Sequence, residues 1–557
     1  MSGYFDAYFV EGYIDGSWVD FTRDIVSKIH GDYGVFGNQI LDRVGEPGTA
    51  KFTLDNNASN SAGLVGYYSP GHENCRLGFK PGLKVRIRFV LDGYSIKKWE
   101  GKIPKDGIEV TSGNYSNKTV QVTVKTWFYI ASKHEIKGIE LATNKTIMQG
   151  VPLVLANMPA SLQPPGTIKY YTGESVFPTL FDINKQTTTA LSEFGKMAQS
   201  EIGFIYETRH GLVVEGRLTR NEEKTKLDSY PKATSELGLL INENNDFLVN
   251  EDGKRILISN STTAIFDNVQ SNADLSYGDG YYNSAKFRAY PRRVDAAATT
   301  ILFTLQSPMY IGAGESVVIS GGYSDPTGVA KNVSGTDIVT PFETPTHYQA
   351  FANNDGTGTD LSSNLTVTTI DPVTLKSTIG TADFKVYILN SGDAGYITKF
   401  NLVGRGIYAN IPVDYYEEDA ADIEDYEPSP LVLDMKYQAD PYVAKRWAQI
   451  SLFQTKTFRY SANKVHFKAS IDLVYLFAFL YLEPGHRPRF KEDVTGLYSD
   501  FFIQGVSFDI LLDGSLEFFW VLRASGLDTF NFVRWSPTST PVPGYGTWDD
   551  PVYGWDF

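Results

Sequence analysis

The chain has almost no residues that could cross-link it. Cys75 is the single cysteine among its 557 residues, so no disulfide can form within it. This excludes a small disulfide-stapled scaffold and says little about the compartment. A chain of this length buries about three quarters of its unfolded surface without such staples, and we expect roughly three to five domains.

Long apolar runs and an excess of basic residues are also missing. The longest apolar run, residues 471–482, contains Asp472 and is too short to span a bilayer as a helix. The first residues have neither the basic nor the apolar region of a signal peptide. A formal charge of −15 would repel phosphates, which argues against a dedicated nucleic-acid binder. We expect a soluble protein that is made in the cytoplasm.

Patterns typical of catalysis, cofactors and metals are missing as well. No two of the seven histidines have the spacing of a helical zinc pair, and there is no Gly-x-Ser-x-Gly elbow or phosphate-binding loop. A Ser-His-Asp site assembled across the fold remains an alternative. Residues 353–360 carry oxygen side chains at alternating positions, as calcium prefers, but lack the distal glutamate of an EF-hand. We expect a loop tip there, no enzyme activity and no cofactor or metal.

What the sequence does contain is typical of β-structure. Aromatic residues make up 14% of the chain, and 50 glycines and 26 prolines indicate many turns. In residues 83–89 apolar and basic side chains alternate, as on a half-buried strand. Four other segments complete a set of short strands with the spacing of a small barrel: 18–22, 51–56, 99–103 and 119–124.

Two helix-then-hairpin patterns follow. Asp440 is a good N-cap and Pro441 fits the first helical turn, so the spacing predicts a helix near 441–454 with Trp447 on its apolar face. After it we expect strands at 465–469, 471–482 and 501–512, and a tight turn at Asp513-Gly514. An earlier helix near 189–201 begins after a threonine run and precedes two short strands, 203–207 and 212–215.

The segment 272–420 differs in character, since Thr, Ser, Gly, Asp and Val dominate it. Four strand patterns separated by turns predict an inserted β-sandwich: 301–305, 316–320, 365–370 and 384–389. The acidic stretch 417–425 is followed by two prolines, and a solvated linker is the favoured interpretation.

The order of these segments resembles tailed-bacteriophage tail-hub proteins of the siphophage type, also called baseplate hub or tail-tip minor tail proteins. Residues 48–56, 68–70, 82–87 and 99–103 are similar to their first barrel. Residues 190–214 are similar to their helix-hairpin segment, residues 394–407 to the strands that close their inserted module, and residues 440–452 and 502–510 to their second barrel.

The resemblance implies a mainly β, or α+β, fold with a few short helices. The expected domains are a first hub β-barrel (1–135), an α+β segment (136–271), the inserted β-sandwich (272–420), a second hub β-barrel (421–535) and a C-terminal arm (536–557).

The resemblance also implies a structural role at the phage tail tip. A homotrimer with two barrels per subunit would give a pseudo-sixfold ring that closes or continues the tail tube. Its expected partners are the distal tail protein ring, the C-terminus of the tape-measure protein, and tail fibre or receptor-binding proteins. DNA would pass through the channel without specific binding. The alternative is a host-surface tail protein that binds or degrades glycans.

The last residues form a candidate docking arm. Prolines and glycines prevent regular structure there, yet five aromatic residues follow one another: Tyr545, Trp548, Tyr553, Trp555 and Phe557. Exposed rings are costly in water, so we expect the arm to place them in pockets of another subunit. An arm folded back on its own chain is the alternative.

Overall fold

A computed structural model describes most of the chain. The described residues are 5–37, 39–91, 93–113, 117–181, 187–220, 265–267, 272–328, 332–375, 377–470, 473–524, 534–535 and 545–546. The chain divides into two compact units. Unit 1 consists of Met1–Trp127, Tyr206–Tyr281 and Thr457–Phe557, and unit 2 of Phe128–Ile205 and Tyr282–Lys456.

Unit 1 is built on one sheet of fourteen strands. Its main path runs in the order β17 (Asn272–Tyr277), β30 (Tyr460–Lys468), β33 (Leu516–Ala524), β32 (Leu497–Ile510), β3 (Ile29–Gly34), β4 (Thr49–Asp55), β8 (Thr119–Lys125), β6 (Tyr94–Lys102), β5 (Lys84–Leu91), β1 (Ala7–Ile14) and β2 (Ser17–Asp20). Off this path, β7 (Ile108–Thr111) pairs with β8, β31 (Arg489–Glu492) with β32, and β16 (Ile265–Asp267) with β31.

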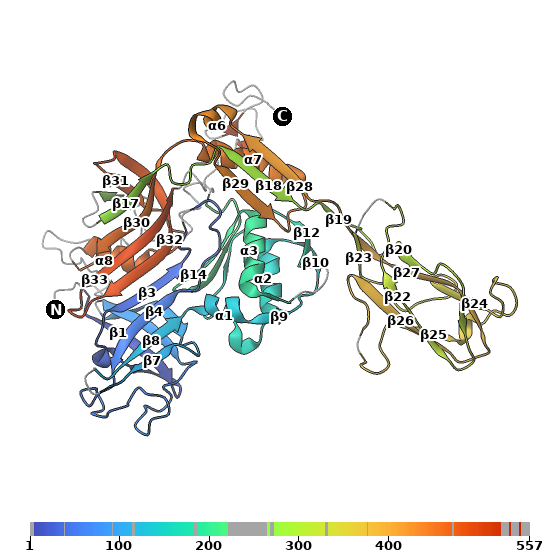
Figure 1. The fold of residues 1–557 in the computed structure, drawn as a ribbon, viewed down its shortest axis with the longest axis horizontal. Coiled ribbons are helices and arrows are strands. Elements are labelled where there is room, and N and C mark those ends of the chain that lie inside the picture. Colours follow the sequence, from blue (N-terminus) through green and yellow to red (C-terminus); the bar gives the residue numbers. More distant parts are fainter. Residues whose placement is uncertain are drawn as a thin grey trace, which may run out of the picture. The chain divides into compact units, whose positions relative to one another are not determined.

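Strands from the N-terminal and C-terminal parts of the chain meet in the middle of this sheet. Strand β3 pairs antiparallel with β32 from Ile29↔Ile510 to Gly34↔Gly505. Figure 1 shows the blue strand β3 beside the orange-red strand β32. Segments that the sequence assigned to two separate barrels are therefore hydrogen-bonded into one sheet.

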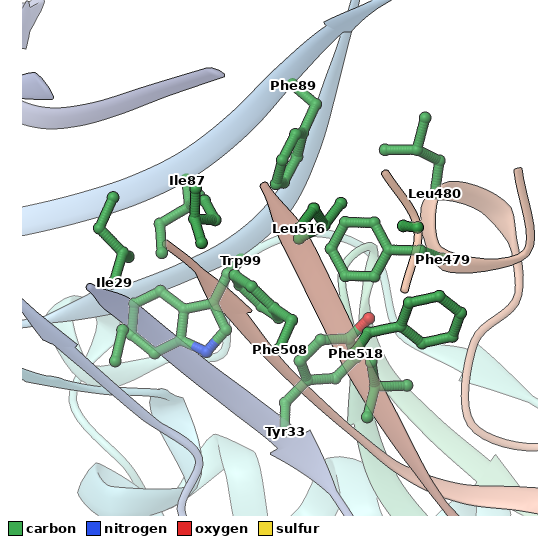
Figure 2. Packing of buried hydrophobic residues seen from close by; sticks show 14 of the residues in the cluster. Ile29, Tyr33, Ile87, Phe89, Trp99, Phe479, Leu480, Phe508, Leu516 and Phe518 are labelled. Carbon is green, nitrogen blue, oxygen red and sulfur yellow. The ribbon is translucent and has the colours of Figure 1, made fainter. Parts of the chain in front are cut away.

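A single hydrophobic core follows this sheet from end to end. Phe479 packs its ring 5.2 Å from Phe89, 5.3 Å from Phe508 and 5.5 Å from Phe518, measured between ring centroids (Figure 2). Phe89 comes from the N-terminal part of the chain, whereas the other three rings come from its C-terminal part. The pairs of Phe479 with Phe89 and Phe508 are edge-to-face, and such pairs add to the stability that burial provides.

Residues 473–481 of the apolar run 471–482 form a helix, so the prediction of this run as a strand is wrong. Helix α8 (Leu473–Tyr481) buries Tyr475 and every residue from Leu476 to Leu480 in the core of unit 1. A helix that is buried all round reads as a continuous apolar run, and periodicity alone cannot distinguish it from a buried strand.

The two helices predicted from their caps are confirmed. Thr189 caps α3 (Ala190–Glu201) by accepting a hydrogen bond from the Ser192 N–H, and Asp440 caps α7 (Pro441–Thr455) by accepting one from the Tyr442 N–H. Helices α1 (Trp127–Lys133) and α2 (Ile147–Ala156) precede them. The short strands around them are β9 (Glu135–Lys137), β10 (Ala142–Lys145), β11 (Lys169–Tyr170), β12 (Phe177–Leu180) and β13 (Thr187–Thr189). The predicted hairpin after α3 is formed by β14 (Phe204–Thr208) and β15 (Gly211–Glu215).

Helix α7 packs in unit 2 and not against the C-terminal hairpin. Its neighbours are β18 (Ser284–Ala289) and β28 (Val413–Glu418), which form a three-stranded sheet with β29 (Pro430–Met435). Trp447 is buried, as predicted, with 4% of its surface exposed. In the sheet beneath α7 the central strand β18 is far from β28 and β29 in sequence, so the local pattern could not indicate this sheet.

The inserted sandwich is confirmed as part of unit 2. The long strand β27 (Gly395–Ala409) pairs with five strands: β19 (Arg292–Val294), β20 (Thr300–Thr304), β21 (Met309–Ile311), β23 (Asn332–Thr336) and β24 (Tyr348–Phe351). The second sheet contains β22 (Ser316–Gly322), β26 (Asp383–Asn390) and β25 (Leu365–Thr368) (Figure 1). A separate core that includes Ile319, Phe384 and Phe400 joins the two sheets.

The predicted domain boundaries remain predictions, but two segments pair differently from what they suggest. Strand β17, which the sequence places in the insertion, pairs with β30 of unit 1. The stretch predicted as an acidic linker contains the end of β28 and helix α6 (Ala420–Tyr426), which Asp419 caps by accepting from the Asp422 N–H. A local cap therefore gives the acidic run a helical turn.

The sandwich should be removable without unfolding the rest of unit 2. Arg292 and Ala409 are register partners, so its two chain connections lie side by side. We expect that replacing residues 292–409 by a short Gly-Ser linker leaves the protein soluble with a melting temperature close to that of the full chain. Thermal unfolding followed by circular dichroism tests this. Insolubility of the shortened protein would mean that the sandwich shares a core with its neighbours.

Candidate functional site

Of the predicted docking arm, residues 536–557, the structure describes only Tyr545 and Gly546. Tyr545 lies in the short strand β35 (Tyr545–Gly546), which pairs parallel with β34 (Arg534–Trp535). Trp548, Tyr553, Trp555 and Phe557 lie outside the described residues. Docking by these rings therefore stays a prediction.

The described part of the chain offers no group of three or more His, Cys, Asp or Glu side chains that could hold a metal ion. The loop considered for calcium uses its carboxylates locally: Asp355 accepts from Thr357, and Asp360 accepts from the Ser362 N–H. Such bonds are typical of a loop tip. Among the described helices, none has the length and apolar character needed to cross a membrane.

Surfaces and buried polar clusters are therefore the features that distinguish this chain. One buried polar cluster is centred on Glu483, which directly follows the apolar run of α8. The Lys98 ammonium donates to Glu483 Oε1 at 2.7 Å, and the Tyr33 hydroxyl donates to Oε2 at 2.8 Å. Arg209, from the turn between β14 and β15, places its Nε 3.6 Å from Oε1. Four distant segments of unit 1 thus meet at one carboxylate.

A bulge in β6 explains how a lysine enters the core. The register of β5 and β6 shifts between Ile87 and Arg88, so that Lys98 is the extra residue beside Trp99. A bulge lets two successive side chains point to the same side, and both Lys98 and Trp99 are buried.

Burial lowers the pKa of Lys98 to about 8, and the Glu483 charge opposes this shift. Burial would raise the pKa of Glu483, but the charges of Lys98 and Arg209 and the hydrogen bonds from Lys98 and Tyr33 outweigh it, so this pKa is lowered. Both groups are charged at neutral pH, the lysine by a narrower margin. We call these residues, Tyr33, Lys98, Arg209 and Glu483, the buried ion cluster.

A second cluster lies at the pairing of β3 with β32. His30 Nδ1 is 2.8 Å from Asp509 Oδ1, and its Nε2 is 3.2 Å from Asp32 Oδ2. Lys28 Nζ adds a contact of 3.1 Å to Asp509 Oδ2. The hydrogen bonds to Asp32 and Asp509 raise the pKa of His30 to about 9, so the imidazolium links the first and last segments of the sheet at neutral pH.

The contribution of His30 to the stability of the folded chain should depend on pH. Its pKa is higher in the folded than in the unfolded chain, so its stabilising effect is complete below about pH 6.5 and is lost as the pH rises through about 9. We expect His30→Gln to lower the free energy of unfolding by only about 1–2 kcal/mol at pH 6, because the site is partly exposed to solvent. At pH 10 the loss should be much smaller, because His30 is then neutral in the folded chain as well. Urea unfolding at the two pH values measures this. His72→Gln, in an exposed loop, is the matched control.

No family model matches the sequence, and no curated protein matches it. Several solved structures are similar to this chain, and three of them are tail proteins. A tail protein from Neisseria meningitidis MC58 is 7% identical with a TM-score of 0.43, and the match covers 94% of this chain and 98% of that one. The 43 kDa tail protein of prophage MuSo2 from Shewanella oneidensis is 9% identical with a TM-score of 0.43, over 93% and 99% of the two chains. A prophage tail protein from Listeria monocytogenes is 7% identical with a TM-score of 0.36, and the match covers 92% of this chain and 94% of that one.

Neither cluster was predicted from the sequence. Glu483 follows an apolar run and Lys98 interrupts an alternating strand, and such charged residues at core positions are the signal that could have indicated a buried pair. The partner of each residue lies hundreds of positions away, so local patterns could not join them.

Proposed function

We propose that this chain is a structural protein of a phage tail, and more finely a tail-tip hub subunit without enzyme activity. In this proposal three copies form a ring that closes or continues the tail tube. The ring holds the distal tail protein, the end of the tape-measure protein and the fibre or receptor-binding proteins, and the virion is its final location.

The pairing of β3 with β32 carries this proposal. It joins an N-terminal set of strands and a C-terminal set into one sheet with one core, within a single unit. A subunit that contributes two joined β-modules to a ring lets three copies match a sixfold tube, as the order of segments in the sequence implies. A ring wall also needs rigidity, and a continuous core supplies it.

The C-terminal arm belongs to the same proposal. Fully burying one large side chain stabilises a contact by roughly 1.5–3 kcal/mol, so several rings would hold an arm on another subunit after its ordering entropy is subtracted. We expect that truncation after Ser536 leaves the melting temperature of the chain nearly unchanged and weakens its association with its own copies or with tail extract. Sedimentation of the truncated and full chains tests this. A lower melting temperature with normal association would place the arm on its own subunit.

Labelling of intact tails tests the proposed function itself. Gold-labelled antibody against this protein should mark one end of the tail, and tails lacking the protein should fail to attach or to deliver DNA. Label along the whole tail tube, or normal infectivity without the protein, would contradict the hub role.

A second candidate is a host-surface glycan reader, for which the sandwich offers one specific observation. Tyr310 is 55% exposed and forms an edge-to-face pair with Tyr396 at 5.4 Å between ring centroids. Exposed rings of this type suit stacking against sugars. Binding of the isolated sandwich to host envelope, lost in Tyr310→Ala, would favour this function over the hub.

A further inference from the structure

One face of the unit 1 sheet carries a row of side chains that crosses five strands. Lys84 of β5 is the register partner of Lys102 in β6, and Lys102 is the partner of Lys125 in β8. The row continues to Tyr13 of β1, whose ring centre lies 6.0 Å from Lys84 Nζ, and to its register partner Trp18 of β2. We call Lys84, Lys102 and Lys125 the lysine row.

The neighbouring row on the same face contains both acidic and basic side chains. It contains Asp20, Glu11, Arg86 and Glu100 as successive register partners, so the basic Arg86 lies between two acidic residues, Glu11 and Glu100. Arg86 Nε donates to Glu11 Oε2 at 2.6 Å. Arg88, one row further, also donates to this carboxylate, at 2.9 Å. These arginines are neutralised within the sheet.

The lysine row has no such compensation. Among the described residues, none of its three members forms an ion pair, and Lys125 donates to the hydroxyl of Thr49 at 2.6 Å. Burial and the adjacent Lys84 charge lower the pKa of Lys102. Like charges that face each other across strands are destabilising. Three of them in succession, in a chain with a net charge of −15, indicate a surface that an acidic partner covers.

Helix α6 of unit 2 has the complementary properties. None of its seven residues is buried, although an isolated helix of this length is not stable in water. Its side chains include Asp422, Glu424 and Asp425, and within the described chain these carboxylates form no ion pair. Asp422 and Asp425 are three positions apart, which places their Cβ atoms about 5–6 Å from each other. Facing residues on neighbouring strands have a similar Cβ separation of about 4.5–5.5 Å.

We infer that the lysine row is a docking surface for helix α6 of a second copy of this chain. The inference rests on the proposed ring and names the surfaces that would build it. A contact between two different surfaces of identical subunits is head-to-tail, and repeated by rotation it closes into a ring. Tyr13 and Trp18 extend the row with apolar area to the edge of the sheet.

Nucleic acid is a poorer occupant of this surface. The overall charge repels phosphates, and the arginines beside the row are occupied by Glu11. Three lysines on adjacent strands extend over only about 10 Å, whereas phosphate-driven binding gains strength from many contacts along a strand. A short acidic helix fits this length.

Charge reversal in the full-length protein tests the contact. We expect Lys84→Glu/Lys102→Glu, and separately Asp422→Lys/Asp425→Lys, to raise the self-dissociation constant about tenfold or more in sedimentation velocity, because like charges are then opposed. Mixing the two variants should restore pairwise association but not a closed ring of three, because one of its three contacts would still join like charges. High salt should weaken the wild-type assembly. Lys51→Glu, an exposed lysine one row away on β4, is the matched control and should associate normally.

Four other results would overturn the inference, each for a different reason. If both variants associate as the wild type does, a ring forms through other surfaces and the hub proposal stands. If the wild type stays monomeric at all concentrations, the contact between copies does not exist, and tail labelling still decides the function. A concentration-independent loss of melting temperature in both variants would place α6 on its own chain. A loss of DNA binding with unchanged association would make the row a nucleic-acid surface.

Discussion

Lys98→Met should lower the free energy of unfolding by about 3–5 kcal/mol, since removing one partner of a buried ion pair leaves the other uncompensated. Lys98 is fully buried and the Glu483 side chain is 5% exposed, so water cannot replace the lost ammonium. The remaining Arg209 Nε lies farther from Oε1, at 3.6 Å. Urea unfolding, with an unchanged dependence on urea concentration, measures the loss.

The neighbouring residue provides a matched control. Lys97 pairs with Glu100 at 2.8 Å, but its side chain is 36% exposed, so Lys97→Met should cost at most about 1 kcal/mol. The double variant Lys98→Met/Glu483→Gln should recover part of the loss, because the carboxylate charge is removed as well. If Lys97→Met and Lys98→Met were equally destabilising, the lysine in the bulge would have to reach solvent, contrary to the packing described above.

Trp447→Ala should destabilise unit 2 by about 3–5 kcal/mol, as is usual when a large buried aromatic side chain is removed and a cavity remains. Trp447 lies on the face of α7 that packs on β18 and β28, together with the buried Ala444 and Ala448. Differential scanning calorimetry should show a lower melting temperature, since even a few kcal/mol is a large part of the stability of a domain.

Phe453→Ala on the same helix separates packing from helix propensity. Its side chain is 75% exposed, so we expect a change within about 0.5 kcal/mol. Equal effects of the two substitutions would mean that the register of α7 on its sheet is different.

Local chemistry made part of this fold predictable. An N-cap acts within a few residues, so Thr189 and Asp440 indicated where α3 and α7 begin. The turn at Asp513-Gly514 is equally local, since Gly514 adopts a positive φ of 82° between β32 and β33. The alternation of apolar and polar residues along β5 and β8 likewise indicated which side chains enter the core, because successive side chains of a strand point to opposite faces.

What could not be predicted depends on contacts between distant residues. The apolar run in α8 has no polar face to reveal its period, because the sheet and its partners bury it on all sides. The bulge that turns Lys98 inward requires the register of β5 against β6, and its partner Glu483 lies 385 residues away. The predicted docking rings after Tyr545 remain a sequence-based expectation.

Because β3 pairs with β32, the sheet of unit 1 cannot be completed until nearly the whole chain has been synthesised. Roughly 470 residues separate these strands, and at about 5–20 residues per second the ribosome needs about half a minute to a minute and a half to make them. During that time the β3 edge that will receive β32 is open, and an open edge can pair with another chain. A cell that makes many copies at once must therefore keep nascent chains apart until β32 has emerged from the ribosome.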